Sequence, residues 1–277
     1  DLPAPTLPSG LLTPALRAQE KLGWRLGIEA YTFHKYTLFE TIEKTAKLGL
    51  PYVGGLSFQK VSKDIPKNFT PNLSDDELQA IRLKMDEAGV RMLTYYYHTI
   101  PNDEAGCRAV FEFGRKMGIE VFMTEPAVEA LPMIDRFCQE YGIKVGLHNH
   151  DRKASPHYWS PEAILRVCEG RSSYMGACAD VGYWIRDGID PVKGIEQLKD
   201  RLITLQLHDL DVAGPKGADV PWGSGAGQTE ALLRKMHELQ VKPVMVGLEY
   251  SRDWLENEPP VQRCIEFFNQ LSLSLSK

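Results

Sequence analysis

The sequence predicts a single α/β domain, a (β/α)₈ or TIM barrel, because apolar runs alternate regularly with helical segments. From Trp24 onward, eight short apolar or mixed runs have the length of buried strands, and amphipathic segments separate most of them. The chain has 277 residues, of which 43% are hydrophobic and 25% charged, and both size and composition suit such a barrel. We therefore expect an N-terminal arm over residues 1–23 and the barrel over residues 24–277.

The predicted strands are short and bordered by glycine, proline or charged residues. They are Arg25–Tyr31, Tyr52–Leu56, Arg91–Tyr97, Glu120–Thr124, Lys144–His148, Met175–Asp180, Leu202–His208 and Val244–Glu249. Because helical sequence lies between successive runs, we expect parallel strands whose carboxyl ends gather at one end of the sheet.

Capping residues mark the predicted helices. Ser74-Asp-Asp-Glu77 is a capping box, and Gly89 ends the helix that it opens. The expected helices are Glu77–Ala88, Asn102–Met117, Val128–Tyr141, one starting at Ser160-Pro161, one starting at Asp190-Pro191, Thr229–Leu239 and Pro260–Leu271. A helix followed by glycine and then a strand is the αβ half of a βα unit, which supports the barrel.

A doubly wound open sheet is the rival architecture, and two features disfavour it. No GxGxxG motif follows the first predicted strand, where a dinucleotide-binding sheet carries it. Polar residues also end nearly every predicted strand, as expected for a closed ring with its site at one mouth.

Charge, hydropathy and cysteine content exclude several classes of protein. The net charge is −5 without a long basic run, so we expect no nucleic-acid partner. No apolar stretch approaches the roughly 20 residues that span a bilayer. Five scattered cysteines without a CxxC motif do not make a disulfide scaffold. The compartment stays open between the cytoplasm and, if a signal peptide was removed before Asp1, the periplasm. A homo-oligomer is compatible with this composition.

Four predicted strands end on a side chain that can bind a metal: His148, Asp180, His208 and Glu249. A lone histidine here is more often structural, and a lone acid can cap the next segment, but a shared rim favours a metal site. Two imidazoles and two carboxylates suit Mn²⁺, Fe²⁺, Co²⁺, Zn²⁺ or Mg²⁺ and disfavour Ca²⁺. We expect one divalent metal ion, with Mn²⁺ or Zn²⁺ favoured.

Three residues are candidates for moving a proton: Glu249, His150 and Glu125. Glu125 ends the fourth predicted strand, and three roles stay open for it: a further metal ligand, a base or a buried ion-pair partner. His150 follows His148 in a His-Asn-His string at the end of the fifth predicted strand.

Other polar and aromatic residues near the predicted strand ends are candidate substrate contacts. Two of the histidines follow aromatic runs that could stack on a sugar ring, although aromatic residues there also build protein cores. The glycine-rich loop 214–227 lacks a GK[ST] motif, and a loop of this length at a barrel mouth is more often a lid than a connector. The candidate substrate-binding residues are His34, His98, Asp209, Lys216, Trp222 and Arg252.

Four stretches in the second half of the chain resemble one family in combination: 178–188, 207–209, 219–225 and 247–250. They resemble the xylose-isomerase-like sugar phosphate isomerase/epimerase superfamily, which includes ketose 3-epimerases, inosose dehydratase and endonuclease IV. The likeness runs from about Trp24 to the end of the chain. It implies a TIM barrel that acts on a carbohydrate.

The resemblance also implies a divalent metal, often Mn²⁺, held by an acid, an Asp, a His and a Glu at the ends of strands five to eight. The last three correspond to Asp180, His208 and Glu249, whereas the fifth-strand position is His148. The family's usual His three residues after the Asp is Tyr183 here. Because the epimerases use two metal-bound glutamates as opposed acid and base, one carboxylate of that pair is missing.

We therefore predict a divalent-metal-dependent isomerase, epimerase or lyase acting on a sugar, keto-sugar or cyclitol. The metal would acidify a C–H bond beside a carbonyl and stabilise the resulting enediolate. Reprotonation would give isomerisation or epimerisation, and loss of a β-substituent would give elimination. A non-catalytic carbohydrate-binding barrel with a degenerate site and a metal-dependent hydrolase are the alternatives.

Overall fold

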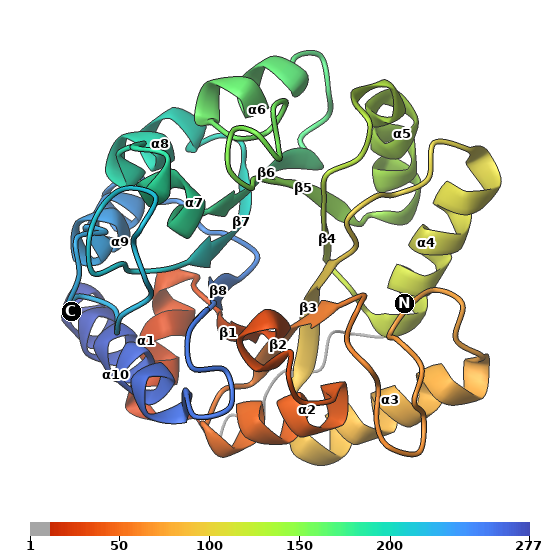
Figure 1. The fold of residues 1–277 in the computed structure, drawn as a ribbon, viewed down its shortest axis with the longest axis horizontal. Coiled ribbons are helices and arrows are strands. Elements are labelled where there is room, and N and C mark those ends of the chain that lie inside the picture. The colour runs from red at the N-terminus through yellow and green to blue at the C-terminus, as the bar shows by residue number, and fades with distance from the viewer. Residues whose placement is uncertain (1–11) are drawn as a thin grey trace.

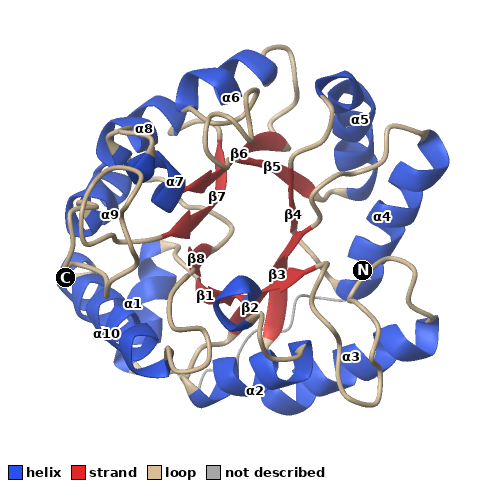
Figure 2. Cartoon of the chain, viewed as in Figure 1, coloured by secondary structure: helices blue, strands red, loops and turns tan. Residues whose placement is uncertain are grey.

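A closed barrel of parallel strands forms the centre of the molecule, as the sequence predicts. The computed structural model describes residues 12–277, in which the ring runs from β1 to β8 in chain order and closes through pairing of β1 with β8. Figures 1 and 2 show the strands as an inner ring with the helices outside it. The strands are β1 (Leu26–Glu29), β2 (Tyr52–Leu56), β3 (Arg91–Tyr96), β4 (Val121–Thr124), β5 (Lys144–His148), β6 (Met175–Asp180), β7 (Leu202–Leu207) and β8 (Val246–Leu248).

The helices match the predicted ones to within a few residues and add three that the sequence reading did not name, α1, α2 and α7. They are α1 (Pro14–Leu22), α2 (Leu38–Lys47), α3 (Asp75–Ala88), α4 (Glu104–Met117), α5 (Leu131–Tyr141), α6 (Pro161–Val167), α7 (Val181–Arg186), α8 (Pro191–Leu198), α9 (Thr229–Glu238) and α10 (Glu258–Leu275). The predicted capping box forms, since Ser74 accepts from the Glu77 amide and Glu77 from the Ser74 amide. Among the helices of residues 12–277, none has the length and apolar character needed to cross a bilayer.

The predicted N-terminal arm lies partly within the described residues. Residues 1–11 of it lie outside them, and the remainder contains α1. Figure 1 places α1 beside α10, and Gln19 of α1 donates a 2.7 Å hydrogen bond to Asn269 of α10. The start of the chain therefore contacts its last helix.

Several strands end earlier than the sequence predicts. A 3₁₀ turn (Ala30–Phe33) takes over after Glu29, and β8 stops before Glu249. The predicted helix Val128–Tyr141 divides into a 3₁₀ turn (Val128–Ala130) and α5, whose first turn contains a proline. Proline lacks an N–H and is tolerated in the first turn of a helix.

Alternate strand residues divide between two apolar clusters. On β4, Phe122 belongs to the large cluster that includes helix residues, and Val121 and Met123 belong to a smaller second cluster. Successive side chains of a strand point to opposite faces of a sheet, so the smaller cluster fills the ring and the larger one joins strands to helices. The barrel is therefore packed below its mouth.

Gly176 on β6 provides a test of how closely neighbouring strands approach. A Cβ atom at this position would lie 2.0 Å from the backbone carbonyl oxygen of Arg201. We expect Gly176→Ala to lower the free energy of unfolding by about 1–3 kcal/mol, measured by urea denaturation, because the backbone must shift. Gly49→Asn is the control, since its Cβ would meet open space and asparagine tolerates the left-handed conformation. Equal stability of the Gly176 variant and the parent would contradict this packing.

Candidate metal centre and substrate cavity

A cavity of about 420 Å³ opens at the carboxyl ends of the strands. One part of its wall is polar and contains His148, His150, Asp180, Arg186, His208 and Glu249. Another part is aromatic and contains Tyr31, Phe58, Tyr96, Tyr183 and Trp254. A concave site with a few converging polar groups and apolar walls is the usual form of a small-molecule site.

Asp180, His208 and Glu249 lie together with one ligand atom from each facing the others. The His208 Nε2 atom is 3.7 Å from Asp180 Oδ1 and 3.7 Å from Glu249 Oε1. These separations are too long for hydrogen bonds, but two ligands that each lie about 2.1 Å from one ion are typically 3–4 Å apart. His208 Nε2 is buried and has no hydrogen-bond partner among the described residues. This residue set therefore fits a divalent metal.

The other nitrogen of His208 is held by Asp219, a residue that the sequence reading did not select. His208 Nδ1 lies 2.7 Å from Asp219 Oδ1, and both side chains are buried. Arg186 lies 3.5 Å from the second carboxylate oxygen of Asp219. A carboxylate on one imidazole nitrogen leaves the other free to face an ion, which is the common arrangement around metal-binding histidines. Asp219 belongs to the stretch 219–225, so its place in the resemblance was the available signal.

Charge compensation sets the protonation of this group. Burial disfavours the imidazolium of His208, but the carboxylates of Asp219 and Asp180 outweigh burial and raise its pKa to about 9. Burial raises the pKa of the Glu249 carboxyl to about 7. The positive charge of His208 opposes this rise, and the negative charge of Asp180 adds to it. Burial acts on Asp180 in the same way, but the two histidines overcome it and lower the pKa of this carboxyl.

Asp180 also caps the helix that follows it. Its Oδ1 atom accepts a 3.1 Å hydrogen bond from the Tyr183 amide at the start of α7. The Asn149 side chain donates a 3.0 Å hydrogen bond to the backbone carbonyl of Asp180 and accepts a 2.9 Å hydrogen bond from the Asp180 amide. Capping and a ligand role are therefore compatible, and the backbone of Asp180 is held in place.

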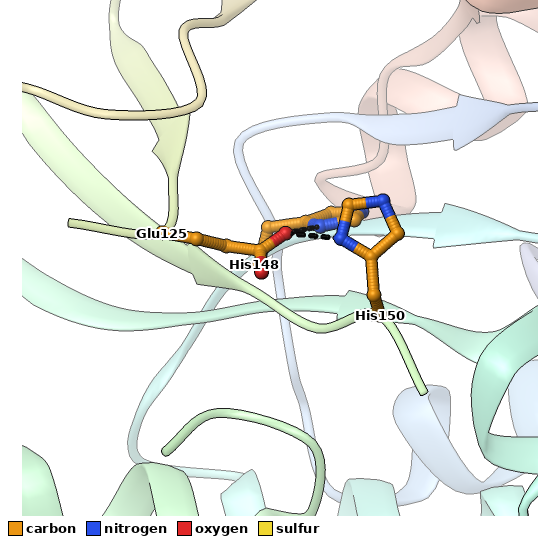
Figure 3. A group of neighbouring side chains, drawn as sticks. All are labelled: Glu125, His148 and His150. Atoms are coloured by element: carbon orange, nitrogen blue, oxygen red, sulfur yellow. Dashed lines mark hydrogen bonds and ion pairs between the residues drawn. The ribbon is translucent and has the colours of Figure 1, made fainter. Parts of the chain in front are cut away.

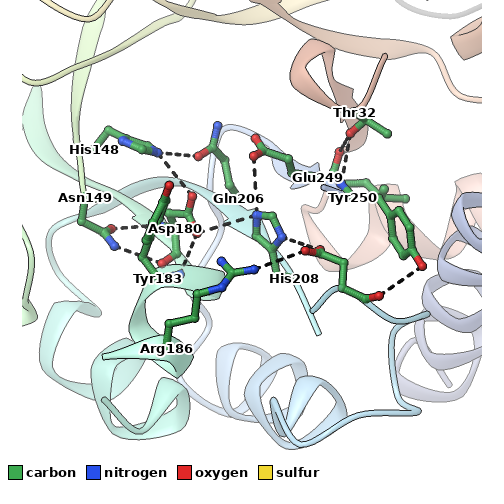
Figure 4. Close-up of polar contacts among 12 residues, drawn as sticks. Thr32, His148, Asn149, Asp180, Tyr183, Arg186, Gln206, His208, Glu249 and Tyr250 are labelled. Atoms are coloured by element: carbon green, nitrogen blue, oxygen red, sulfur yellow. Dashed lines mark hydrogen bonds and ion pairs between the residues drawn. The ribbon is translucent and has the colours of Figure 1, made fainter. Parts of the chain in front are cut away.

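His148, the fourth residue predicted to bind the metal, has a different environment from the other three. Its Nδ1 lies 2.8 Å from Glu125 Oε1 and its Nε2 lies 2.7 Å from Gln206 Oε1. Its Nε2 is also 3.4 Å from Asp180 Oδ2. Burial disfavours its imidazolium, but Asp180 and Glu125 outweigh burial and raise the pKa of His148 to about 10. The structure therefore brings three of the four predicted ligands together, with ligand atoms within 4.8 Å of one another, while His148 is hydrogen bonded at both nitrogens (Figure 4).

Glu125 joins His148 to His150. Figure 3 shows both imidazoles approaching the same carboxylate, and Ser155 donates to its second oxygen. Burial alone would raise the pKa of Glu125, but the two histidines outweigh burial and hold this pKa well below its usual range. Of the three roles open for Glu125, the described contacts fit a buried ion-pair partner.

Glu29 is a second buried acid that the sequence reading missed. It ends β1, lines the cavity, and its carboxylate occupies the space left by two glycines. A Cβ atom on Gly54 would lie 2.1 Å from Glu29 Oε2, and one on Gly247 would lie 2.4 Å from Glu29 Oε1. Burial, reinforced by the charge of Glu249, raises the pKa of Glu29 well above its usual range. An acid ending the run Leu26-Gly-Ile-Glu29 was the available signal.

The predicted substrate contacts lie outside the described cavity lining. Asp209 is buried, and its carboxylate accepts from the amides of Gly223 at 2.8 Å, Gly225 at 3.1 Å and Gly227 at 2.8 Å. It therefore folds the glycine-rich loop onto the barrel. Trp222 is buried against Phe268 of α10.

The remaining predicted contacts are at the surface or behind the aromatic wall. Lys216, Arg252 and His98 are exposed. His34 is half-buried and stacks on Tyr31 with ring centroids 4.3 Å apart. None of these four residues is among those that line the described cavity, and their contact with a substrate stays a prediction.

Replacement of Asp209 tests its part in holding the loop. We expect Asp209→Asn to lower the free energy of unfolding by about 1–3 kcal/mol, because an amide replaces a charged acceptor of three backbone N–H groups. Urea denaturation and limited proteolysis within loop 214–227 would measure the effect. Asp253→Asn, at an exposed position on the following loop, is the control. Unchanged proteolysis of the Asp209 variant would contradict this role.

The pH dependence of stability tests the environment of His148. Its pKa of about 10 exceeds the value of about 6.5 in an unfolded chain. The folded protein therefore holds this proton more tightly, and its stabilising contribution is lost as pH rises from about 6.5 to about 10. With chelator present, we expect the free energy of unfolding to fall over this range more steeply in the parent than in His148→Gln. His157→Gln, at an exposed position, should keep the parental slope. Equal slopes for the parent and the His148 variant would refute the expectation.

Comparison with known proteins identifies the family. A family model described as "Xylose isomerase-like TIM barrel" matches residues 42–271. A crystal structure of an uncharacterised Parabacteroides distasonis protein is 29% identical, with a TM-score of 0.72 over 90% of this chain and 99% of that chain. A D-tagatose 3-epimerase-like protein is 17% identical, with a TM-score of 0.67 over 89% and 98% of the two chains. The IOLI protein, solved with a bound zinc atom, is 17% identical, with a TM-score of 0.64 over 90% and 98% of the two chains.

A comparison with curated proteins found no match. The matched residues span most of the chain, and the chain therefore belongs to the xylose isomerase-like TIM barrel family.

Proposed function

We propose that this chain is a divalent-metal-dependent isomerase, epimerase or lyase acting on a sugar, keto-sugar or cyclitol. The observation that carries the proposal is the buried, unpartnered Nε2 of His208 at 3.7 Å from carboxylate oxygens of both Asp180 and Glu249. One imidazole and two carboxylates suit Mn²⁺ or Zn²⁺. Two structural neighbours support the same class of chemistry: the IOLI protein, solved with a bound zinc atom, and the D-tagatose 3-epimerase-like protein.

A bound divalent ion would supply Lewis acidity, which polarises a substrate carbonyl and makes the neighbouring C–H bond more acidic. The chain supplies the groups that move the proton. Glu249 lines the cavity, where its carboxylate can take up and release a proton. His150 also lines the cavity and is held through its Nδ1 by Glu125, so its Nε2 is left to face the substrate. Glu125 is then a positioning residue.

The end of β5 favours elimination over two-carboxylate epimerisation. His148 stands where the resemblance implies an acid, so the cavity has Glu249 without a second metal-bound glutamate beside it. Glu249 and His150 can still divide the work of base and acid between a C–H bond and a departing oxygen. Elimination needs these two proton transfers, whereas epimerisation needs a proton donor on the opposite face of the same carbon.

Metal-dependent C–H exchange tests the proposal. We expect protein reloaded with Mn²⁺ or Zn²⁺ to exchange the proton beside the carbonyl of a keto-sugar or inosose in D₂O, measured by proton NMR. His208→Gln and Glu249→Gln should lower the rate by about 100-fold or more. His157→Gln, at an exposed position outside the cavity, is the control.

Three results would argue against the proposal. Purified protein that takes up no divalent ion would remove its basis. Carbohydrate binding that is indifferent to chelator, without C–H exchange, would indicate a binding barrel. Incorporation of solvent oxygen without C–H exchange would indicate a hydrolase.

A further inference from the structure

We propose that His148 is a positioning residue that does not bind the metal, so that the protein ligands are Asp180, His208 and Glu249 alone. This inference rests on the proposed function, because it concerns the metal that this function requires. His148, at the end of β5, then orients the residues around the ion.

The Nδ1 side of His148 is enclosed by a buried acid. Glu125 Oε1 lies 2.8 Å from Nδ1, and the Glu125 side chain is 5% exposed. The same carboxylate also contacts His150 and accepts a hydrogen bond from Ser155. Because both carboxylate oxygens are engaged, Glu125 is held in place, and His148 Nδ1 faces it rather than the ion site.

The Nε2 side of His148 is directed at an amide oxygen. Gln206 Oε1 lies 2.7 Å away, whereas the nearer ligand carboxylate, Asp180 Oδ2, is 3.4 Å away. Coordination through Nε2 would require this ring to leave Gln206, whose buried oxygen would then lose its donor. His148 Nε2 is thus engaged at 2.7 Å by Gln206. By contrast, His208 Nε2 lies 3.7 Å from Asp180 Oδ1 and has no hydrogen-bond partner among the described residues.

His148 therefore orients two neighbours of the ion. It lies within ion-pair distance of Asp180, and its hydrogen bond turns the oxygen of the Gln206 amide toward β5. In Figure 4 the amide nitrogen of Gln206 points away from His148. Gln206 lines the cavity, and its amide nitrogen lies 4.0 Å from Met123 Sδ. A three-residue ligand set also leaves coordination positions for substrate oxygens.

The number of coordinated imidazoles tests this inference directly. Cu²⁺ is the probe ion, because its high affinity for imidazole would recruit any histidine that is free to bind. Pulsed electron paramagnetic resonance of the Cu²⁺-loaded protein should detect one coordinated imidazole. The signal should disappear in His208→Gln, and persist in His148→Gln and in the His157→Gln control.

Metal affinity gives a second readout of the positioning role. We expect His148→Ala to weaken Mn²⁺ binding about 10-fold, because Asp180 and Gln206 lose a common partner. His148→Gln, which keeps an N–H donor, should restore most of the loss. His208→Gln should weaken binding more than either substitution.

The outcomes separate this inference from the proposed function. Two coordinated imidazoles in the parent protein, or loss of the nitrogen signal in His148→Gln, would overturn the inference while leaving the metal enzyme intact. A protein that binds no Mn²⁺ or Cu²⁺ would overturn both. If the His148 variants do not fold, the imidazole count of the parent alone decides the question.

Discussion

Closure of parallel strands into a ring is the constraint on which the rest of this structure depends. The carboxyl ends of all the strands therefore lie at the same mouth. Glu29, His148 and Asp180 end their strands, and His208 and Glu249 directly follow theirs. All five are buried. Buried ionisable groups are costly unless each finds an opposite charge, a hydrogen bond or a metal. The surrounding loops are arranged to meet this requirement.

The buried ionisable groups find their partners differently in the two halves of the mouth. On the β4–β5 side, Glu125, His148 and His150 satisfy one another through contacts at hydrogen-bond distance. On the β6–β8 side, Asp180, His208 and Glu249 stay further apart, and one buried nitrogen has no partner among the described residues. This difference separates the candidate metal ligands from the residues that position them.

The loop after β7 has a structural part that reaches the candidate metal ligands. Asp209 binds three of its glycine amides, and Asp219 within the loop holds His208. The glycines suit this task because their amides can approach a buried carboxylate closely. A Cβ on Gly225 would lie 2.5 Å from Asp209 Oδ1. The same loop therefore folds onto the barrel and fixes the orientation of one candidate metal ligand.

Sequence alone determined the barrel, the order and approximate bounds of its strands, and the positions of Asp180, His208 and Glu249 at their carboxyl ends. These follow from local patterns, since strand length, helix capping and the direction of parallel strands depend on neighbours in the chain. Tertiary structure decided which polar side chains face the cavity and which face one another. Glu29, Gln206 and Asp219 enter the site, Asp209 and Trp222 leave it, and both nitrogens of His148 become hydrogen bonded. Residue type at a strand end does not specify these roles, because each depends on partners contributed by other strands and loops.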